Sequence, residues 1–451
     1  MHDRIVRNIR LLSPEGWQAA DLAIDQGRFS AIGKTDEAGR EIIDGRGSLC
    51  FPGGVDLHVH FNEPGRTRWE GFSTGSLAAA AGGCTFAAEM PLNSIPSTTT
   101  VQALEEKLHS IGAKSHVDFA LWGGLVPGNL ESLQPLADEG VIAFKAFMSP
   151  SGTDDFINSD IATLKEGMKR IAPTGKFLAL HAEDPAVLDP ANRRLARRSN
   201  ALDWEASRPV EAEISAIEIA IELAGETGCP IHIVHVSSAQ ALAPIAQAKA
   251  KGVDITCETC PHYLLLSIED AERIGPDAKC APPLRYRNSL ATLWECLAAG
   301  EIDTIGSDHS PCPPEMKAGL SFFDSWGGIS GLQHGLPLLW HRCANDPKSL
   351  FQLTRLSTLN PAKKVGLETK GSLKIGKDAD FILVDSKTPP EKIELRDLLY
   401  KHSASAYCGM EQSLAVRQTW LRGNPIFENG APSGDPTGKF YRLPSESPAP
   451  R

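Results

Sequence analysis

Short apolar segments alternate with longer helical patterns through the middle of the chain, and this alternation limits the possible folds more than any other feature. Spaced apolar residues typical of helices lie between the apolar segments, for example over residues 209–227 and 239–250. Chains with this alternation form parallel sheets, because a helix returns each strand to the same end of the sheet. The predicted strands are Val55–His60, Thr85–Met90, Asp118–Gly123, Val141–Met148, Phe177–His181, Ile231–Val236, Asp254–Cys257 and Thr304–Asp308.

Eight strands of this kind favour a protein of the α/β class with a (β/α)8 barrel of the TIM type. An open doubly wound sheet is the alternative. The glycine-rich signatures that accompany nucleotide binding in such sheets follow none of the predicted strands. The barrel is therefore the preferred prediction, over residues 53–365.

The two ends of the chain have a different texture, with short strands and turns. Residues 21–24 and 28–32 flank a turn that contains Gly27, which is a hairpin pattern. Residues 379–384 and 420–427 look similar. We expect residues 1–52 and 366–430 to form one small composite β-sandwich domain. Residues 431–451 are rich in proline, serine and glycine and are predicted to be a mobile tail.

The composition is that of a globular protein, with 41% hydrophobic and 22% charged residues in 451. A formal net charge of -11 argues against nucleic acid or an anionic membrane as a partner. No apolar run approaches the ~20 residues that span a bilayer, and the first residues lack the apolar core of a signal peptide. These features predict a cytoplasmic protein.

The ten cysteines have no regular spacing, which predicts reduced thiols rather than a disulfide framework. The single CxxC motif, Cys257 to Cys260, has no partner pair. Its two cysteines are also expected to face opposite sides of a strand. A zinc or redox role for this motif is therefore disfavoured.

Two histidines near the end of the first predicted barrel strand are candidate metal ligands. His58 and His60 are two residues apart and should face the same side of the strand. Two imidazoles on one face can bind one metal ion. Taken alone, two histidines with ordinary hydrogen bonds would be the simpler interpretation.

Lys145 lies within the apolar segment Val141–Met148, where burying an ammonium group would be costly. Burial lowers the pKa of a lysine and yields a neutral amine. A neutral amine can add CO2, and the resulting carbamate could bridge two cations. Considered by itself, Lys145 is better explained as a lysine that reaches solvent or a buried carboxylate.

Three more metal-type residues lie toward the ends of predicted strands, namely His181, His235 and Asp308. His232 is three residues before His235 and should point the other way, so we leave it out. Because active sites of β/α barrels lie at the carboxyl ends of the strands, these side chains should converge with His58, His60 and Lys145. Four histidines, an aspartate and a carbamate could hold two metal ions and activate water for hydrolysis.

With these residues in view, the chain resembles the amidohydrolase superfamily, and within it the cyclic amidohydrolases. That group includes dihydroorotases, hydantoinases and allantoinases. The resemblance extends over nearly the whole chain, including residues 371–380 of the β module. Segments 58–71, 307–317 and 326–333 are most similar to the allantoinases.

The resemblance implies a role for each candidate residue. His58 and His60 would bind the more buried metal ion, and His181 and His235 the other. Lys145, modified to N6-carboxylysine by CO2, would bridge the two ions. Asp308 would ligate the buried ion and act as the catalytic proton shuttle. The donor set suits zinc, with iron, cobalt and manganese left open.

Two positions differ from the sister families. Dihydroorotases carry an arginine two residues after the second histidine, whereas this chain has Asn62. Hydantoinases carry a tyrosine shortly after the modified lysine, whereas residues 147–151 contain none. The first difference favours an uncharged substrate. The second counts against a hydantoinase and leaves the oxyanion to be stabilised mainly by the metal ions. Arg66 and Arg68 lie nearby, so the first argument is not absolute.

Substrate contacts are predicted for Asn62, Asn93 and Ser310, in loops beyond strand ends, and by resemblance for the main chain near Ala281. For Asn93 and Ser310, a hydrogen bond that caps a loop is an equal alternative. His262 also follows a strand, and an indirect or structural role is expected for it.

The expected function is therefore the hydrolytic ring opening of allantoin to allantoate by a hydroxide bound to two metal ions. A hydantoinase, dihydropyrimidinase or dihydroorotase activity on another cyclic amide is the alternative. A non-catalytic scaffold of the same fold is more remote, because all six ligand positions are filled. The resemblance also implies a homotetramer.

Overall fold

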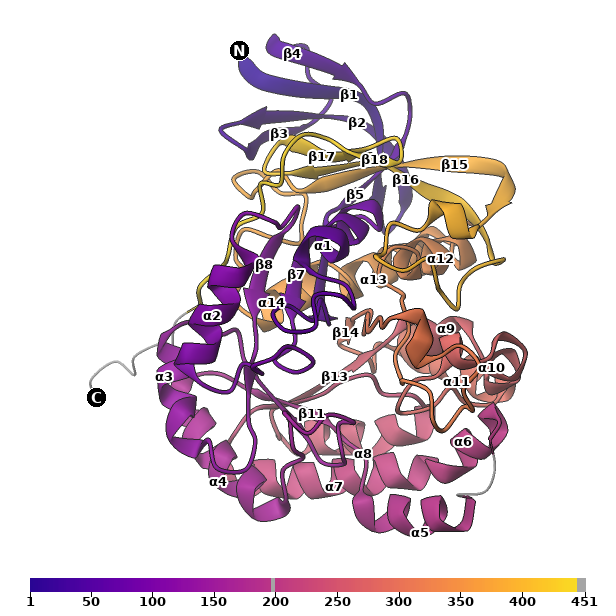
Figure 1. Ribbon diagram of the computed structural model, residues 1–451. Helices are drawn as coiled ribbons and strands as arrows, with labels where there is room; N and C mark the ends of the chain where they lie inside the picture. The colour runs from indigo at the N-terminus through magenta and orange to yellow at the C-terminus, as the bar shows by residue number, and fades with distance from the viewer. Residues whose placement is uncertain (196–198, 444–451) are drawn as a thin grey trace.

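The structure, a computed structural model, describes residues 1–195 and 199–443. A barrel of eight parallel strands forms one end of the molecule and a β module forms the other (Figure 1). The barrel strands are β6 (Gly54–Val59), β7 (Cys84–Glu89), β8 (Asp118–Leu121), β10 (Phe144–Phe147), β11 (Leu178–His181), β12 (Ile231–Ile233), β13 (Ile255–Thr259) and β14 (Thr304–Ile305). The short strand β9 (Gly123–Gly124) continues β8 beyond Trp122.

Backbone contacts close the barrel between its first and last strands. Val59 of β6 forms a parallel bridge with His309, just beyond β14. The N–H of His60 donates to the His309 carbonyl at 2.8 Å. Every residue of β7, β8, β10 and β11 is buried, which explains why these strands are continuous apolar runs in the sequence. The predicted α/β class and (β/α)8 barrel are confirmed.

Helices surround the barrel, and α7 (Val210–Thr227) and α8 (Ala239–Ala250) match the two helical patterns described above. Side-chain oxygens of Thr100, Asp160 and Ser238 accept from the first-turn N–H groups of the helices they precede. The other helices are α1 (Phe72–Ala81), α2 (Val101–Ile111), α3 (Leu133–Asp138), α4 (Ile161–Ile171), α5 (Pro185–Leu195), α6 (Ala201–Ser207), α9 (Pro261–Leu265), α10 (Ile268–Ile274), α11 (Arg287–Ala299), α12 (Gly335–Arg342), α13 (Pro347–Leu356) and α14 (Leu359–Lys364).

Two barrel strands end three residues earlier than predicted. β12 stops at Ile233 and β14 at Ile305, so His235 and Asp308 lie beyond the regular strands. Both have left-handed backbones, with φ of 42° and 45°. Non-glycine residues pay a steric cost in this region, and such residues gather at functional sites.

The β module is a nine-stranded sheet in the order β18-β17-β16-β15-β5-β1-β2-β3, with β4 paired to β1. The predicted hairpin is β2–β3, and its turn residues Gln26 and Gly27 both have positive φ, as tight hairpins require. The strands are β1 (His2–Ser13), β2 (Gly16–Asp25), β3 (Arg28–Gly33), β4 (Gly39–Asp44), β5 (Leu49–Pro52), β15 (Phe381–Lys392), β16 (Glu411–Leu421), β17 (Asn424–Glu428) and β18 (Ala431–Pro432).

Antiparallel pairing of β5 with β15 joins the two chain ends, with Phe51 opposite Ile382. Side chains from both ends then share one core. The rings of Phe29 and Phe381 lie 6.1 Å apart, and Phe381 stacks on Trp420 at 5.1 Å. The sheet thus folds into the β-sandwich expected from the two terminal segments.

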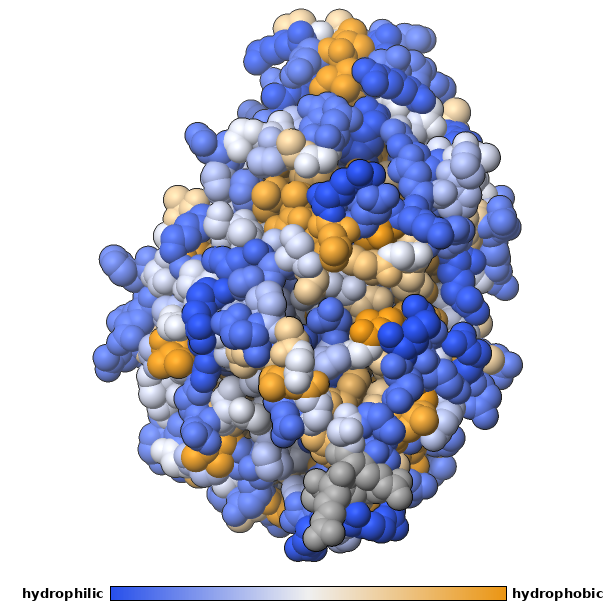
Figure 2. Space-filling view, turned by 45° about the vertical axis from the view of Figure 1, so that its right-hand side comes forward, coloured by the Kyte–Doolittle hydropathy of each residue, from blue (hydrophilic) through white to orange (hydrophobic). Residues whose placement is uncertain are grey.

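The surface is mainly hydrophilic on the face seen in Figure 2, where hydrophobic residues gather in a band between the β module and the barrel. Within residues 1–195 and 199–443, no helix is both long and apolar enough to cross a lipid bilayer.

All ten cysteines are free. Burial raises the pKa of Cys257 to about 12 and that of Cys260 well above its usual value, which disfavours the thiolate that metal binding or redox chemistry needs.

The C-terminal segment returns to the barrel instead of forming a free tail. Phe440 forms a parallel bridge with Phe119 of β8, and the N–H of Tyr441 donates to the Phe119 carbonyl at 2.7 Å. Leu443 donates to the Gly140 carbonyl at 3.0 Å. The prediction of a mobile tail over residues 431–451 is therefore wrong for residues 431–443, because apolar side chains dock on the barrel. Residues 444–451 lie outside the described part of the chain.

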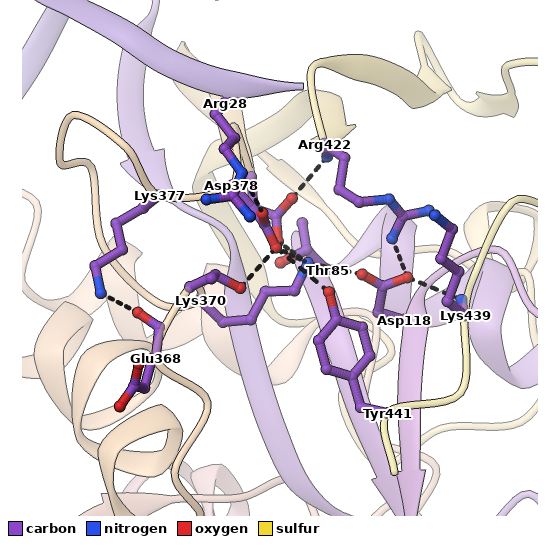
Figure 3. A network of polar contacts seen from close by, with 12 residues as sticks. Arg28, Thr85, Asp118, Glu368, Lys370, Lys377, Asp378, Arg422, Lys439 and Tyr441 are labelled. Atoms are coloured by element: carbon purple, nitrogen blue, oxygen red, sulfur yellow. Dashed lines mark hydrogen bonds and ion pairs between the residues drawn. The ribbon is translucent and has the colours of Figure 1, made fainter. Parts of the chain in front are cut away.

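A buried charge cluster joins the barrel to the module near this segment (Figure 3). Lys370 Nζ lies 2.7 Å from Asp118 Oδ2 of β8, 2.7 Å from Asp380 Oδ2 and 3.0 Å from Asp378 Oδ2. Arg422 also pairs with Asp118. Burial acts to lower the pKa of Lys370, but the three carboxylates hold it above its usual value. One ammonium therefore ties together carboxylates from separate parts of the fold.

Replacing Lys370 with methionine is expected to lower the free energy of unfolding by about 3–5 kcal/mol, because buried carboxylates lose their shared cation. Denaturant unfolding followed by circular dichroism measures the change. Lys348, which is exposed, supplies the control: Lys348→Met should change stability by less than about 0.5 kcal/mol. Equal free energies of unfolding for the two variants would show that the charge cluster does not stabilise the fold.

Candidate metal centre and substrate cavity

His58, His60 and Asp308 form a buried cluster at the carboxyl end of the barrel. His58 Nε2 lies 3.2 Å from Asp308 Oδ1, and His60 Nε2 lies 3.4 Å from the same oxygen. One ligand-type atom from each of the three residues lies within 4.8 Å of the others. Two imidazole nitrogens and a carboxylate oxygen facing one point form a donor set that suits a divalent metal ion. This is a candidate His-His-Asp metal site.

The protonation of His60 and Asp308 is consistent with metal binding. Burial lowers the pKa of His60 to about 4, although Asp308 opposes the shift. Burial alone would raise the pKa of Asp308, but His58, His60 and His235 together hold it well below its usual range. Neutral imidazoles beside an ionised carboxylate are the forms that bind metal.

Lys145 lies on β10, opposite Ala179 of β11, and its side chain is buried. Its Nζ has no hydrogen-bond partner within the described residues. Burial lowers the pKa of Lys145 to about 7, although Asp308 and Glu258 oppose the shift. A buried ammonium without a partner would be costly. A pKa of about 7 gives Lys145 a substantial fraction of neutral amine near neutral pH, and the neutral amine is the form that can react with CO2.

His181 and His235 form a second pair close to the first. His181 Nδ1 lies 3.0 Å from His235 Nε2, and the rings of His58 and His235 are 5.5 Å apart. Burial lowers the pKa of both His181 and His235. The structure thus brings together all six residues that the sequence singled out as metal ligands.

Two carboxylates that were not predicted orient these histidines. Glu258 Oε1 lies 2.7 Å from His58 Nδ1, and Glu183 Oε2 lies 2.7 Å from His181 Nε2. Each bond leaves the other ring nitrogen facing the cluster, as is common for metal-binding histidines. Glu183 follows His181 by two residues and Glu258 lies on a predicted strand boundary. The His181-x-Glu183 spacing is the signal that could have found one of them.

Behind His60, an amide N–H of Asn93 faces the ring, with Nδ2 at 3.4 Å from His60 Nδ1. Burial would raise the pKa of Glu183, but Arg208 and His181 hold it at about 2. The carboxylate that faces His181 is therefore ionised. This favours the tautomer in which His181 donates from Nε2.

A cavity of about 610 Å³ opens above the cluster. Asn93, Ala281 and Ser310 line it, as predicted for substrate contacts. Asn62 does not line it: its side chain is fully buried, and its Nδ2 donates to the Pro311 carbonyl at 3.4 Å. The backbone at Asn62 is left-handed, with φ of 64°. Its predicted direct contact with substrate does not fit this position.

The cations at and near the cavity already have partners. Arg208 pairs with Glu183, and Lys279 Nζ donates to the carbonyls of Phe323 and Ser325 at 3.1 and 2.6 Å. Arg66 is absent from the lining and forms a bidentate pair with Asp155. The lining residues include no tyrosine. A neutral polar ligand fits these walls better than a carboxylate does.

His262 lies in α9 and is fully buried, away from the cavity lining. Its ring packs against Tyr263 at 4.3 Å. Neither ring nitrogen has a hydrogen-bond partner in the part of the chain that the structure describes. This position agrees with an indirect or structural role.

Comparisons with known proteins identify relatives across nearly the full length. Residues 49–426 match the family model described as "Amidohydrolase family". A curated allantoinase from Rubrobacter xylanophilus is 49% identical over 436 residues, covering 95% of each chain. Allantoinases from Solibacter usitatus and Bacillus velezensis are 45% and 43% identical, over 95% and 99% of this chain and 94% and 98% of their own lengths.

Solved structures give the same result for the fold. The L-hydantoinase (dihydropyrimidinase) from Arthrobacter aurescens superposes with a TM-score of 0.93 at 35% identity, over 98% of this chain and 99% of that chain. The dihydropyrimidinase from Brevibacillus agri gives 0.89 at 27% identity, over the same two fractions. With the family model matched over most of its length, the chain belongs to the amidohydrolase family and, by its similarity to the curated relatives, to the allantoinase group within it.

Proposed function

We propose that the protein opens the hydantoin ring of allantoin by hydrolysis and releases allantoate. The observation that carries this proposal is a cavity lined by four histidines and an aspartate of the metal-binding type, in a chain 49% identical to a curated allantoinase. Allantoin is uncharged, and the cations around the cavity are occupied by the protein itself. The solved L-hydantoinase, at 35% identity, favours hydrolysis of other hydantoins as the second candidate.

The residues fit two metal ions. His58, His60 and Asp308 would hold one ion, and the facing nitrogens of His181 and His235 would contribute to a second. A carbamate on Lys145 would supply the anion between them, which the unpartnered Nζ supports. We infer zinc from the imidazole and carboxylate donors, and iron, cobalt or manganese would fit the same set.

Metal ions bound at this site supply an activated water and polarise the ring amide carbonyl. Asp308 accepts the proton of the attacking water and delivers it to the leaving ring nitrogen. Its Oδ1 lies close to both His58 and His60, so it faces the reacting centre. Asn93, Ser310 and the main chain at Ala281 would orient the substrate from the cavity wall. We assign Asn62 the support of its loop, through Pro311.

A comparison of three substrates tests the proposed specificity. Metal-loaded protein should hydrolyse allantoin with a higher kcat/KM than hydantoin or dihydroorotate. For dihydroorotate the reason is that Arg208 and Lys279, the cations of the described cavity wall, already have partners within the protein. Product formation is measured by chromatography at equal substrate concentrations. Faster turnover of dihydroorotate or hydantoin would overturn the substrate assignment.

Metal analysis on the same sample should find two equivalents per chain, and near zero would indicate a non-catalytic scaffold.

The boundaries at residues 52, 365 and 430 stay predictions for separable units, in which residues 53–365 carry the chemistry. A homotetramer and a cytoplasmic location also stay predictions. Size-exclusion chromatography with light scattering measures the oligomeric state.

A further inference from the structure

Arg208 belongs both to the cavity wall and to the hydrogen bonds behind the metal-type histidines. It follows α6 (Ala201–Ser207), which lies on the right of the barrel in Figure 1. Its side chain is 12% exposed, lines the cavity, and pairs with Glu183, whose side chain is 1% exposed. No other cation forms an ion pair with Glu183 within the described residues.

Glu183 carries the effect of Arg208 to His181. The Glu183 Oε2 atom that meets Arg208 also accepts from His181 Nε2 at 2.7 Å. This bond occupies Nε2 and leaves His181 Nδ1 facing His235 Nε2 at 3.0 Å. A carboxylate that accepted only from the imidazole could move more freely, whereas a second, guanidinium partner on the same oxygen holds Oε2 in place.

The backbone of Arg208 reaches the other histidine by a separate route. Its carbonyl accepts from Arg285 Nη1 at 2.7 Å, and Arg285 Nη2 pairs with Glu213 Oε2 at 2.7 Å. Glu213 Oε1 accepts from the N–H of Ser237 at 3.1 Å, and Arg285 Nε donates to Ser237 Oγ at 2.9 Å. Ser237 lies two residues beyond His235. The loops that carry His181 and His235 are therefore joined through Arg208, whose side chain contacts Glu183 and whose carbonyl contacts Arg285.

We propose that Arg208 is a positioning residue for the ring-opening reaction, acting through Glu183 to hold His181 with Nδ1 directed at the metal centre. The inference rests on the proposed function, because it assigns a purpose to the geometry of His181. In this role Arg208 acts through Glu183 rather than directly on the reacting atoms. Its side chain sets the orientation of a ligand, and its carbonyl links that ligand to the Arg285 network behind His235.

The test uses the full-length protein with Arg208→Gln, Arg208→Lys and a matched control, Arg417→Gln. Arg417 has a similar side-chain exposure of 10% and pairs with Asp385 in the β module, far from the cavity. Three quantities are measured: zinc affinity, the visible absorption of the cobalt-substituted protein, and kcat and KM for allantoin. Thermal unfolding reports the folded fraction of each variant.

Arg208→Gln should lower metal affinity or kcat by roughly 10–100-fold, as loss of a partner behind a metal ligand does. Its KM should change less, and the cobalt absorption bands should shift because the ligand geometry changes. Arg208→Lys should recover part of the loss, since a charge next to Glu183 remains. Arg417→Gln should keep the metal affinity, the absorption bands and the turnover of the unchanged protein.

Wild-type metal affinity, cobalt absorption and kcat in folded Arg208→Gln would overturn the inference. If that variant fails to fold, Arg208→Lys decides: its absorption bands must differ from those of the unchanged protein. The proposed function fails separately, if the unchanged protein binds metal but does not open allantoin. In that event an altered metal affinity in Arg208→Gln would still support the positioning role.

Discussion

Lys145→Ala is expected to lose bound metal and to lower kcat for allantoin by roughly a thousandfold or more, which corresponds to several kcal/mol of metal assistance. The amine of Lys145 is buried without a partner and has its pKa lowered to about 7. Addition of CO2 to the neutral amine releases one proton and leaves a carbamate anion on Nζ. Alanine cannot form this anion, so the proposed bridge between the two histidine pairs would be lost. Metal content and steady-state turnover measure both consequences.

Short carboxylic acids sharpen this test. Acetate or propionate can occupy the volume left by the lysine side chain and return one anionic group, so they should restore part of the metal content and turnover of Lys145→Ala. Lys370→Ala removes another fully buried lysine, far from the metal centre. It should lower stability yet keep two metal ions per folded chain. Full activity and two metal ions in Lys145→Ala would mean that no carbamate bridge exists.

Asp308→Asn is expected to lower kcat by about 10²–10⁴-fold, the range for loss of a general acid–base group. Asparagine keeps the size of the side chain and one oxygen for a metal ion, but it does not carry a proton from water to the leaving nitrogen. The Asp308 carboxylate is held ionised by the neighbouring histidines, which suits it to accept that proton. Turnover and metal content are measured on the same sample.

The control is Asp303→Asn, because Asp303 lies at the amino end of β14 whereas Asp308 lies beyond its carboxyl end. Asp303 precedes β14 and accepts from the N–H of Cys257 at 2.7 Å, away from the cluster. Asp303→Asn should leave turnover per folded chain within a few-fold of the unchanged protein. If Asp308→Asn retained its metal and turned over allantoin equally fast, another group would have to move the proton.

The barrel and the β module could be predicted because their signals are local. Apolar runs and turn residues depend on a few neighbouring positions, so α8 was predicted to the residue and β11 to within one residue. The tail was mispredicted for a related reason. The composition around Phe440 and Tyr441 resembles that of a linker. Docking becomes favourable only because the folded barrel places Phe119 next to Phe440.

The site was predicted as far as its end of the barrel and its main side chains. Parallel strands bring their carboxyl ends to one face, so histidines at several strand ends had to converge. The partners behind them could not be predicted. Glu258 meets His58 across 200 positions of the chain, and nothing in a single strand indicates which carboxylate faces which ring nitrogen.

By itself, the sequence determined which donor atoms exist and at which end of which strands they lie, because strand alternation and helix return are properties of short segments. The tertiary structure alone decided three further matters. It lowered the pKa of Lys145 through burial, it engaged Arg208, Lys279 and Arg66 with other partners, and it buried Asn62 outside the cavity lining. Each of these depends on desolvation and on contacts between distant segments, which arise only when the barrel closes.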